Sequence, residues 1–115
     1  MDVKNSKEKY SATAGVEVDF KKIEESIKII SNLDNYEFRT TIVNGLHELE
    51  DVEKMARWLN EIIGKKPKKF ILQGFKNEAK LLDDIFKQTP NTSEKTLEEI
   101  KEKIKDYFEE VEIRV

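Results

Sequence analysis

The side chains best suited to chemistry in this chain of 115 residues are one histidine and several paired carboxylates. An imidazole can act as a general base or a metal ligand near neutral pH. A single histidine in a polar loop is more often a solvated surface residue, and we expect that role for His47. The carboxylate pairs fall beside polar positions of expected helices, which favours solvated faces. These pairs are Glu24/Glu25, Glu98/Glu99 and Glu109/Glu110.

A cluster of lysines surrounds Pro67 in the stretch GKKPKKF, residues 64–70. Such a cluster could meet an anionic partner, but it is short and the neighbouring segments are acidic, so we expect a solvated loop. The sequence contains no phosphate-cradling GxxxxGK, no GxGxxG, no GxSxG and no pair of histidines at metal-ligand spacing. Generic motifs therefore predict no catalytic residues and no metal site.

Composition narrows the function classes further. The chain has no cysteine, so it can form no disulfide and can hold no iron–sulfur cluster through thiolates. Lys+Arg (21) and Asp+Glu (24) nearly cancel, which argues against nucleic acid as a partner. No apolar stretch approaches the about 18 residues that a bilayer requires, and the N-terminus lacks a signal-peptide pattern. We expect one cytoplasmic domain spanning residues 1–115, with no membrane partner.

Helical and strand periodicities alternate along the chain. The order strand, helix, strand, helix, strand, helix, strand predicts an α/β fold with a mainly parallel sheet of about four strands and helices packed on it. Between residues 75 and 92 the pattern weakens, and we expect a long loop with a short helix near residues 81–86. The expected strands lie near residues 1–4, 36–43, 70–72 and 111–115, and the expected helices begin at about residues 20, 50 and 94.

In parallel sheets, ligands bind beyond the carboxyl ends of the strands, where loops and helix N-termini present unpaired backbone donors. In this chain those ends are residues 4–5, 43–47 and 73–75. We therefore expect any functional site to be built from these three short segments.

The same segments carry a family resemblance. The MDVKN start, the stretch YEFRTTIVNGLHELEDVEKMARWL, KKFILQGF, PNTSEKTLEEI and the terminal VEIRV resemble the C-terminal half of the radical S-adenosylmethionine activases of glycyl-radical enzymes. The resemblance is to the type that activates anaerobic ribonucleotide reductase, and it extends over essentially the whole chain. Its most specific part is the FRTT strand followed by the VxGLH turn, with the DxK strand as a second anchor.

The resemblance implies a set of residues that bind the cofactor. Lys4 is similar to the lysine that pairs with the methionyl carboxylate of S-adenosylmethionine, a task that suits a compact ammonium. Asp2 resembles the family aspartate near the cofactor and an associated cation. Arg39 matches the strand arginine that precedes the turn, on the cofactor or substrate side.

Val43, Asn44 and Gly45 correspond to the turn that lies against the adenine in the resembled family. There we expect the glycine to permit close approach of the backbone to the ligand. The family commonly has proline at the position of Asn44. In the pyruvate formate-lyase activases a histidine near the cofactor stands at about the position of Phe75, so this chain departs from that subtype.

The largest departure from the family is an omission. The family holds a [4Fe–4S] cluster through a CxxxCxxC loop, and the cluster cleaves S-adenosylmethionine reductively. This chain has neither that loop nor the glycine-rich GGEP segment. We therefore expect the back half of a partial (β/α) barrel that generates no radical by itself. In the resembled family the target is a glycyl-radical enzyme.

Three interpretations stay open. The first is a non-catalytic fragment of an activase, with an exposed sheet edge that tends to form homo-oligomers. The second is a stand-alone module that binds S-adenosylmethionine or another nucleotide. The third is the protein-interaction half of a split enzyme, whose partner is a missing N-terminal half or another cysteine-bearing protein.

Overall fold

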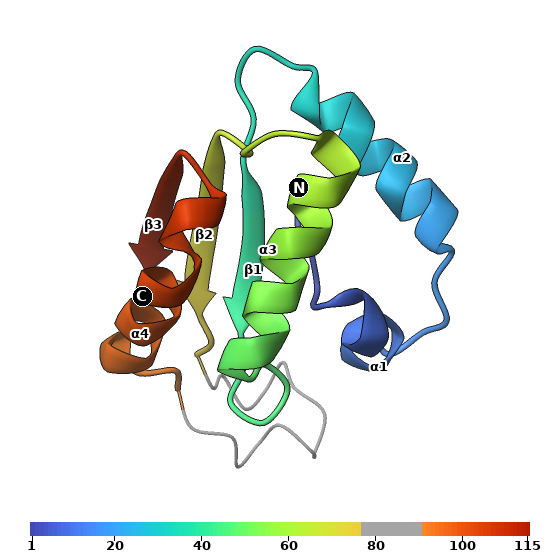
Figure 1. Ribbon diagram of the computed structural model, residues 1–115. Coiled ribbons are helices and arrows are strands. Elements are labelled where there is room, and N and C mark those ends of the chain that lie inside the picture. The colour runs from blue at the N-terminus through green and yellow to red at the C-terminus, as the bar shows by residue number, and fades with distance from the viewer. Residues whose placement is uncertain (77–90) are drawn as a thin grey trace.

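A parallel three-stranded sheet forms the centre of the computed structural model, which describes residues 1–76 and 91–115 (Figure 1). The strand order is β1-β2-β3. In the register of the sheet, Phe38 lies opposite Phe70, and Phe70 lies opposite Val111. The strands are β1 (Phe38–Ile42), β2 (Lys69–Gly74) and β3 (Glu110–Arg114).

The expected helices are confirmed, and their ends follow the capping residues in the sequence. Asp19 accepts hydrogen bonds from two backbone N–H groups of the first turn of α2, and Ser93 accepts one from Thr96 at the start of α4. Gly64 ends α3 with a φ of 79°, a left-handed conformation that glycine adopts without steric cost. These helices are α2 (Phe20–Ser31), α3 (Leu49–Ile63) and α4 (Glu94–Ile104).

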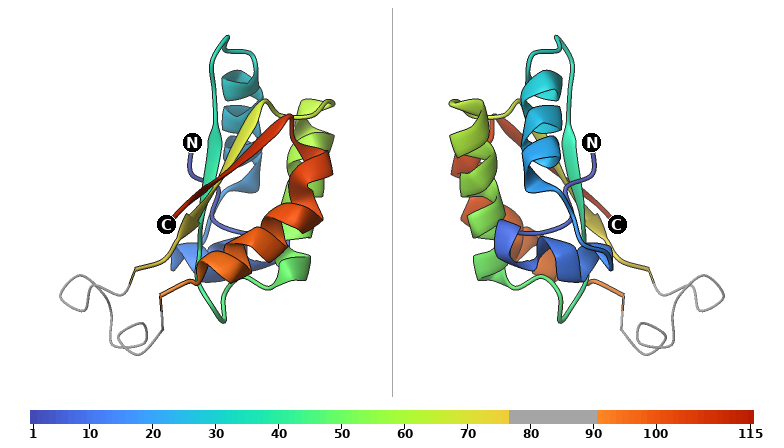
Figure 2. Two further views of the ribbon diagram at one scale, coloured as in Figure 1. Left: turned by 90° about the vertical axis from the view of Figure 1, so that its left-hand side faces the viewer. Right: turned by 90° about the vertical axis from the view of Figure 1, so that its right-hand side faces the viewer.

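All three helices lie on one side of the sheet, and the other face carries no helix of the described residues (Figure 2). The alternation along β1 reflects this arrangement: Phe38, Thr40 and Ile42 are buried toward the helices, whereas Arg39 and Thr41 are exposed. We call the side without a described helix the open face.

The hydrophobic core lies between the sheet and the helices. Phe70 of β2 stacks on Phe108 with 4.6 Å between ring centroids. Tyr10, Phe20 and Trp58 form a cluster of edge-to-face contacts with centroids 6.1–6.2 Å apart. Aromatic pairs of this geometry add about 0.5–1.5 kcal/mol beyond the burial of their area. The cluster fastens the N-terminal segment to α2 and α3.

The expectation of a first strand at residues 1–4 is wrong. Residues 1–4 form only an isolated parallel bridge, in which Asp2 lies opposite Arg39, so the described sheet has three strands rather than four. The segment leaves the sheet because the buried side chain of Asn5 accepts a hydrogen bond from the backbone N–H of Ser6. Two short helices follow that the sequence reasoning missed, η1 (Lys7–Lys9) and α1 (Tyr10–Ala14).

The described residues form an open three-stranded sheet rather than the expected back half of a partial (β/α) barrel. The helix expected near residues 81–86 lies outside the described residues. A short 3-10 helix, η4 (Lys105–Tyr107), links α4 to β3. Within the two described ranges, no helix combines the length and the apolar character that crossing a membrane demands.

Candidate functional site

A concavity of about 380 Å³ lies beside the carboxyl end of β1. Ligand pockets in proteins are typically about 300–1,000 Å³, so it can hold a small molecule. We call it the strand-end pocket. Four of the residues expected from the sequence line it, whereas Asn44 and Gly45 do not. Its lining residues are Asp2, Val3, Lys4, Thr13, Arg39, Thr41, Val43, Leu46, His47 and Phe75.

An ion pair crosses one side of the pocket. Arg39 donates from Nε to Oδ1 of Asp2 at 2.9 Å, and both side chains are close to half exposed. The two residues face each other because the backbone bridge aligns them in register. The hydrogen bond from Arg39 holds the pKa of the Asp2 carboxyl below its usual value, and the same bond raises the pKa of Arg39.

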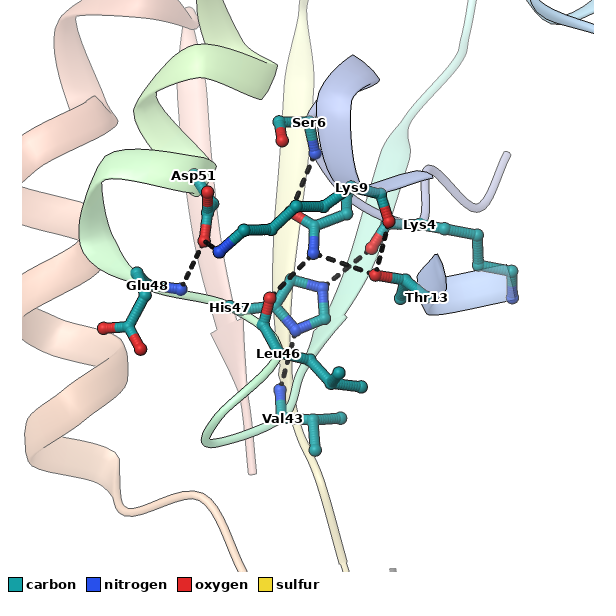
Figure 3. A network of polar contacts seen from close by, with 10 residues as sticks. Lys4, Ser6, Lys9, Thr13, Val43, Leu46, His47, Glu48 and Asp51 are labelled. Carbon is teal, nitrogen blue, oxygen red and sulfur yellow. Dashed lines mark hydrogen bonds and ion pairs between the residues drawn. The ribbon is translucent and has the colours of Figure 1, made fainter. Parts of the chain in front are cut away.

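Lys4 stands two residues beyond Asp2, so both side chains project from the same side of the extended segment. Its carbonyl is fixed by His47, whereas its side chain extends away from the polar network (Figure 3). Among the described residues, the Lys4 ammonium forms no ion pair or hydrogen bond. The pocket thus has one cation that is held by a carboxylate and one that is not.

The turn after β1 has the geometry of type II. The backbone N–H of Leu46 donates to the carbonyl of Val43 at 3.1 Å, and Gly45 has a φ of 91°. Asn44 has a negative φ, since no described residue other than glycine has a positive one. A type II turn requires a positive φ at its third position, which explains the glycine.

Contacts within the described residues do not account for glycine at position 45. A Cβ atom built on Gly45 would meet nothing within 4 Å, so no tight approach by the described residues demands glycine there. Its backbone conformation demands it instead.

His47 corrects the expectation of a solvated loop residue. It is only 7% exposed, and both ring nitrogens are engaged. Nδ1 accepts from the backbone N–H of Val43 at 3.1 Å, so Nε2 carries the proton and donates to the carbonyl of Lys4 at 2.7 Å. Burial lowers the pKa of His47, which keeps the ring neutral. His47 is a clamp between the two segments that form the pocket.

A second polar cross-link supports this clamp, and the sequence reasoning missed it. Asn5 is fully buried and donates from Nδ2 to the carbonyl of Leu46 at 2.8 Å and to Oγ1 of Thr13 at 3.0 Å. Thr13 in turn donates to the carbonyl of Lys9. The N-terminal segment is thereby tied to the turn after β1 by side chains that satisfy its buried backbone groups.

Asp51 fixes the start of α3 and reaches the same segment (Figure 3). Its carboxylate accepts from the backbone N–H of Glu48 at 3.0 Å in a capping box and from Lys9 Nζ at 2.7 Å. Burial raises the pKa of Asp51, but the hydrogen bonds from Lys9 and Glu48 outweigh it, so the pKa lies below its usual value. The carboxylate is charged at neutral pH and structural.

The lysine cluster around Pro67 and the paired carboxylates do not form a second candidate site among the described residues. A larger concavity of about 550 Å³ lies at the opposite end of the sheet, but its lining mixes lysines with carboxylates, and Lys68 there donates to the carbonyl of Asp34. Of the paired carboxylates, Glu24 forms an ion pair with Lys7 at 3.4 Å, and the other five are exposed.

Metal chemistry finds no support in residues 1–76 and 91–115, where no group of three or more His, Cys, Asp or Glu side chains could hold an ion. The strand-end pocket combines two cations, one carboxylate and an apolar wall, which can contact a small charged ligand. Comparison of the chain with models of protein families, with curated proteins and with solved structures finds no match.

Proposed function

We propose that the strand-end pocket binds S-adenosylmethionine and that the chain is the cofactor-binding, non-catalytic part of a protein resembling the radical S-adenosylmethionine activases. One observation carries the proposal. The structure brings Lys4, the Asp2–Arg39 pair and the residues around the turn after β1 to one pocket, although more than thirty positions separate these segments in the sequence.

The charges of the pocket suit the amino-acid end of this ligand. The ammonium of Lys4 is available to pair with the methionyl carboxylate, a charge-assisted contact of the stronger kind. Asp2 has one carboxylate oxygen bonded to Arg39, and its other oxygen can accept from the ligand ammonium. Arg39 holds Asp2 ionised for this contact.

The nucleoside end would lie against the apolar part of the lining. Val43, Leu46 and Phe75 supply this surface, and backbone groups of the turn lie next to it. Aromatic and aliphatic walls with a few polar groups are the usual composition of pockets for ligands of this size. The positive φ of Gly45 supports the proposal only indirectly, by shaping the turn.

An iron–sulfur cluster does not fit the residues of this chain. The chain has no cysteine, and no other group of ligands replaces the thiolates in the described residues. We therefore assign no catalytic step to it. Radical chemistry on a glycyl-radical enzyme would need thiolates from outside these 115 residues.

The test is calorimetric titration with two ligands that share the methylthioadenosine part, of which only one carries the amino-acid end and the sulfonium charge. S-adenosylmethionine has the methionyl carboxylate, and 5′-methylthioadenosine lacks it. We expect Lys4→Ala to weaken the binding of S-adenosylmethionine about tenfold or more and to leave the binding of 5′-methylthioadenosine unchanged, because a charge-assisted hydrogen bond contributes about 1.5–3 kcal/mol.

Lys7→Ala is the matched control, since Lys7 is an exposed lysine outside the strand-end pocket. An equal effect of Lys4→Ala on both ligands, or an equal effect of the two alanine variants, would remove the basis of the proposal. Absence of any S-adenosylmethionine binding to the folded chain would do the same.

A second proposal, that of an interaction half of a split enzyme, is favoured by the open face of the sheet. Ile71 on this face is already buried within the chain, and its neighbours Arg39 and Glu112, with side chains 44% and 39% exposed, supply the surface that a partner would contact. A cysteine-bearing partner covering the face would protect this region. Binding of a purified partner with a CxxxCxxC loop, combined with slower amide exchange in β1 and β2, is the expected result.

A further inference from the structure

The outer edge of β3 has the features of a pairing surface. β3 lies at the end of the sheet, and it pairs with β2 alone among the described strands (Figure 1). The backbone N–H of Glu110 donates to Lys68 on the β2 side. Because N–H and C=O groups alternate sides along a strand, those of Val111 and Ile113 point away from β2. Unpaired edges of this kind template pairing with another chain.

We propose that two copies of this chain pair antiparallel through their β3 edges, with Ile113 of one copy opposite Ile113 of the other. This inference concerns the edge of the sheet opposite β1, whose residues do not line the strand-end pocket, and it does not depend on ligand binding. It commits to a second copy because the edge is self-complementary in charge and in apolar side chains.

The charges select the register. With Ile113 opposite Ile113 of the second copy, Glu112 faces Arg114 of the second copy twice, once on each side of the two-fold axis. A shift by two residues in one direction places Glu112 opposite Glu112 of the second copy, and a shift in the other direction places Arg114 opposite Arg114. Directly opposed like charges destabilise a strand pair, whereas opposite charges stabilise it by about 0.2–1 kcal/mol.

The apolar side chains agree with the same register. Val111 and Ile113 pack on the helix side, and Val115 is 61% exposed on the outer end of this row. In the proposed pair, Val111 faces Val115 of the second copy, and the two Ile113 side chains meet at the axis. The dimer thus extends the core across the edge and covers an exposed valine.

The absence of cysteine makes the register directly measurable. Residues that exchange hydrogen bonds across antiparallel strands have Cα atoms about 5.5 Å apart, within the about 4.4–6.8 Å that a disulfide spans. We expect Ile113→Cys to form a covalent dimer under mild oxidation. Val16→Cys, at a more exposed position away from β3, is the control and should form little.

Two further variants separate the proposal from misfolding. Ile113→Pro removes an N–H that points away from β2 and forms no bond with the described residues, and edge strands tolerate proline there, so sedimentation should report a folded monomer. Arg114→Glu and Glu112→Arg should each be monomeric alone and should form a heterodimer when mixed in equal amounts. A wild-type chain that sediments as a monomer at near-millimolar concentration would overturn the proposal, as would a dimer that the Ile113→Cys substitution fails to cross-link.

Discussion

Replacement of His47 tests whether the buried imidazole holds the two halves of the strand-end pocket together. His47→Phe keeps a ring of similar shape but removes both hydrogen-bonding nitrogens. The backbone N–H of Val43 and the carbonyl of Lys4 then lose their partners. An unsatisfied buried group costs about 1–3 kcal/mol, so we expect the loss of both partners to lower the free energy of unfolding by about 2–6 kcal/mol.

Two partial replacements refine this measurement. The amide of Asn stands close to the place of Nδ1, and that of Gln reaches the place of Nε2. We therefore expect His47→Asn to retain the contact with Val43 and His47→Gln to retain the contact with Lys4. In urea denaturation at neutral pH, each of these variants should lose less free energy of unfolding than His47→Phe. A loss below about 0.5 kcal/mol for His47→Phe is typical of a solvated surface residue and would refute the clamp.

The clamp also predicts how stability depends on pH. The pKa of His47 is lowered in the folded chain, so the unfolded chain binds the proton more readily. The contribution of His47 to the free energy of unfolding is complete above the pKa of about 6.5 that the ring has in the unfolded chain. This contribution is lost as the pH falls from 6.5 through the lower pKa of the folded chain. Denaturation between pH 7.5 and 5 should show this loss in the wild-type chain and not in His47→Phe; identical slopes would contradict the neutral buried ring.

Three more predictions concern the turn, the helix start and the ion pair. Gly45→Ala should lower the free energy of unfolding measured in urea by about 1–2 kcal/mol, because alanine is strained at a φ of 91°. Asn44→Pro should leave the free energy of unfolding unchanged or raise it by about 0.4–1 kcal/mol. The opposite order of stability would contradict the type II turn. Asp51→Ala should cost about 1–2 kcal/mol, since it removes the capping box, and a change within experimental error would show that the box is not needed. Arg39→Met should raise the pKa of Asp2 toward 3.8 in a carbon-detected NMR titration, and an unchanged pKa would exclude the ion pair in solution.

Much of the fold could be predicted because local signals and burial agree. The caps Asp19, Ser93 and Gly64 stand at the ends of strongly amphipathic segments, so the limits of α2, α3 and α4 follow from neighbouring residues alone. The continuous apolar run in β2 likewise predicts the central strand of a parallel sheet.

The expected first strand failed because its fate depends on side chains rather than on the pattern of the strand. Val3 and Thr40 obey the strand pattern, and Thr40 donates its hydroxyl to the carbonyl of Val3. Asn5 then satisfies its own neighbour and the distant turn, which ends the pairing after one bridge. The periodicity of the sequence does not indicate whether side-chain hydrogen bonds will replace the backbone hydrogen bonds of a sheet.

For the site, the position could be predicted and the supporting contacts could not. Asp2 and Arg39 meet because the isolated parallel bridge places them opposite each other, and Lys4 follows two residues later toward the carboxyl end of β1. His47 and Asn5 were missed because their partners lie 43 and 41 residues away, and a polar residue buried by a distant segment has the same sequence appearance as a solvated one. The only available signal was their location at two strand ends.

The central claim is that the strand-end pocket binds S-adenosylmethionine, and titration of the ¹⁵N-labelled chain observed by NMR tests it most directly. We predict saturable shifts of backbone amides at Lys4, Arg39 and residues 43–46, with the Lys4 shift reduced when 5′-methylthioadenosine replaces the ligand. Spectra that do not change, or shifts confined to residues outside the strand-end pocket, would contradict the claim.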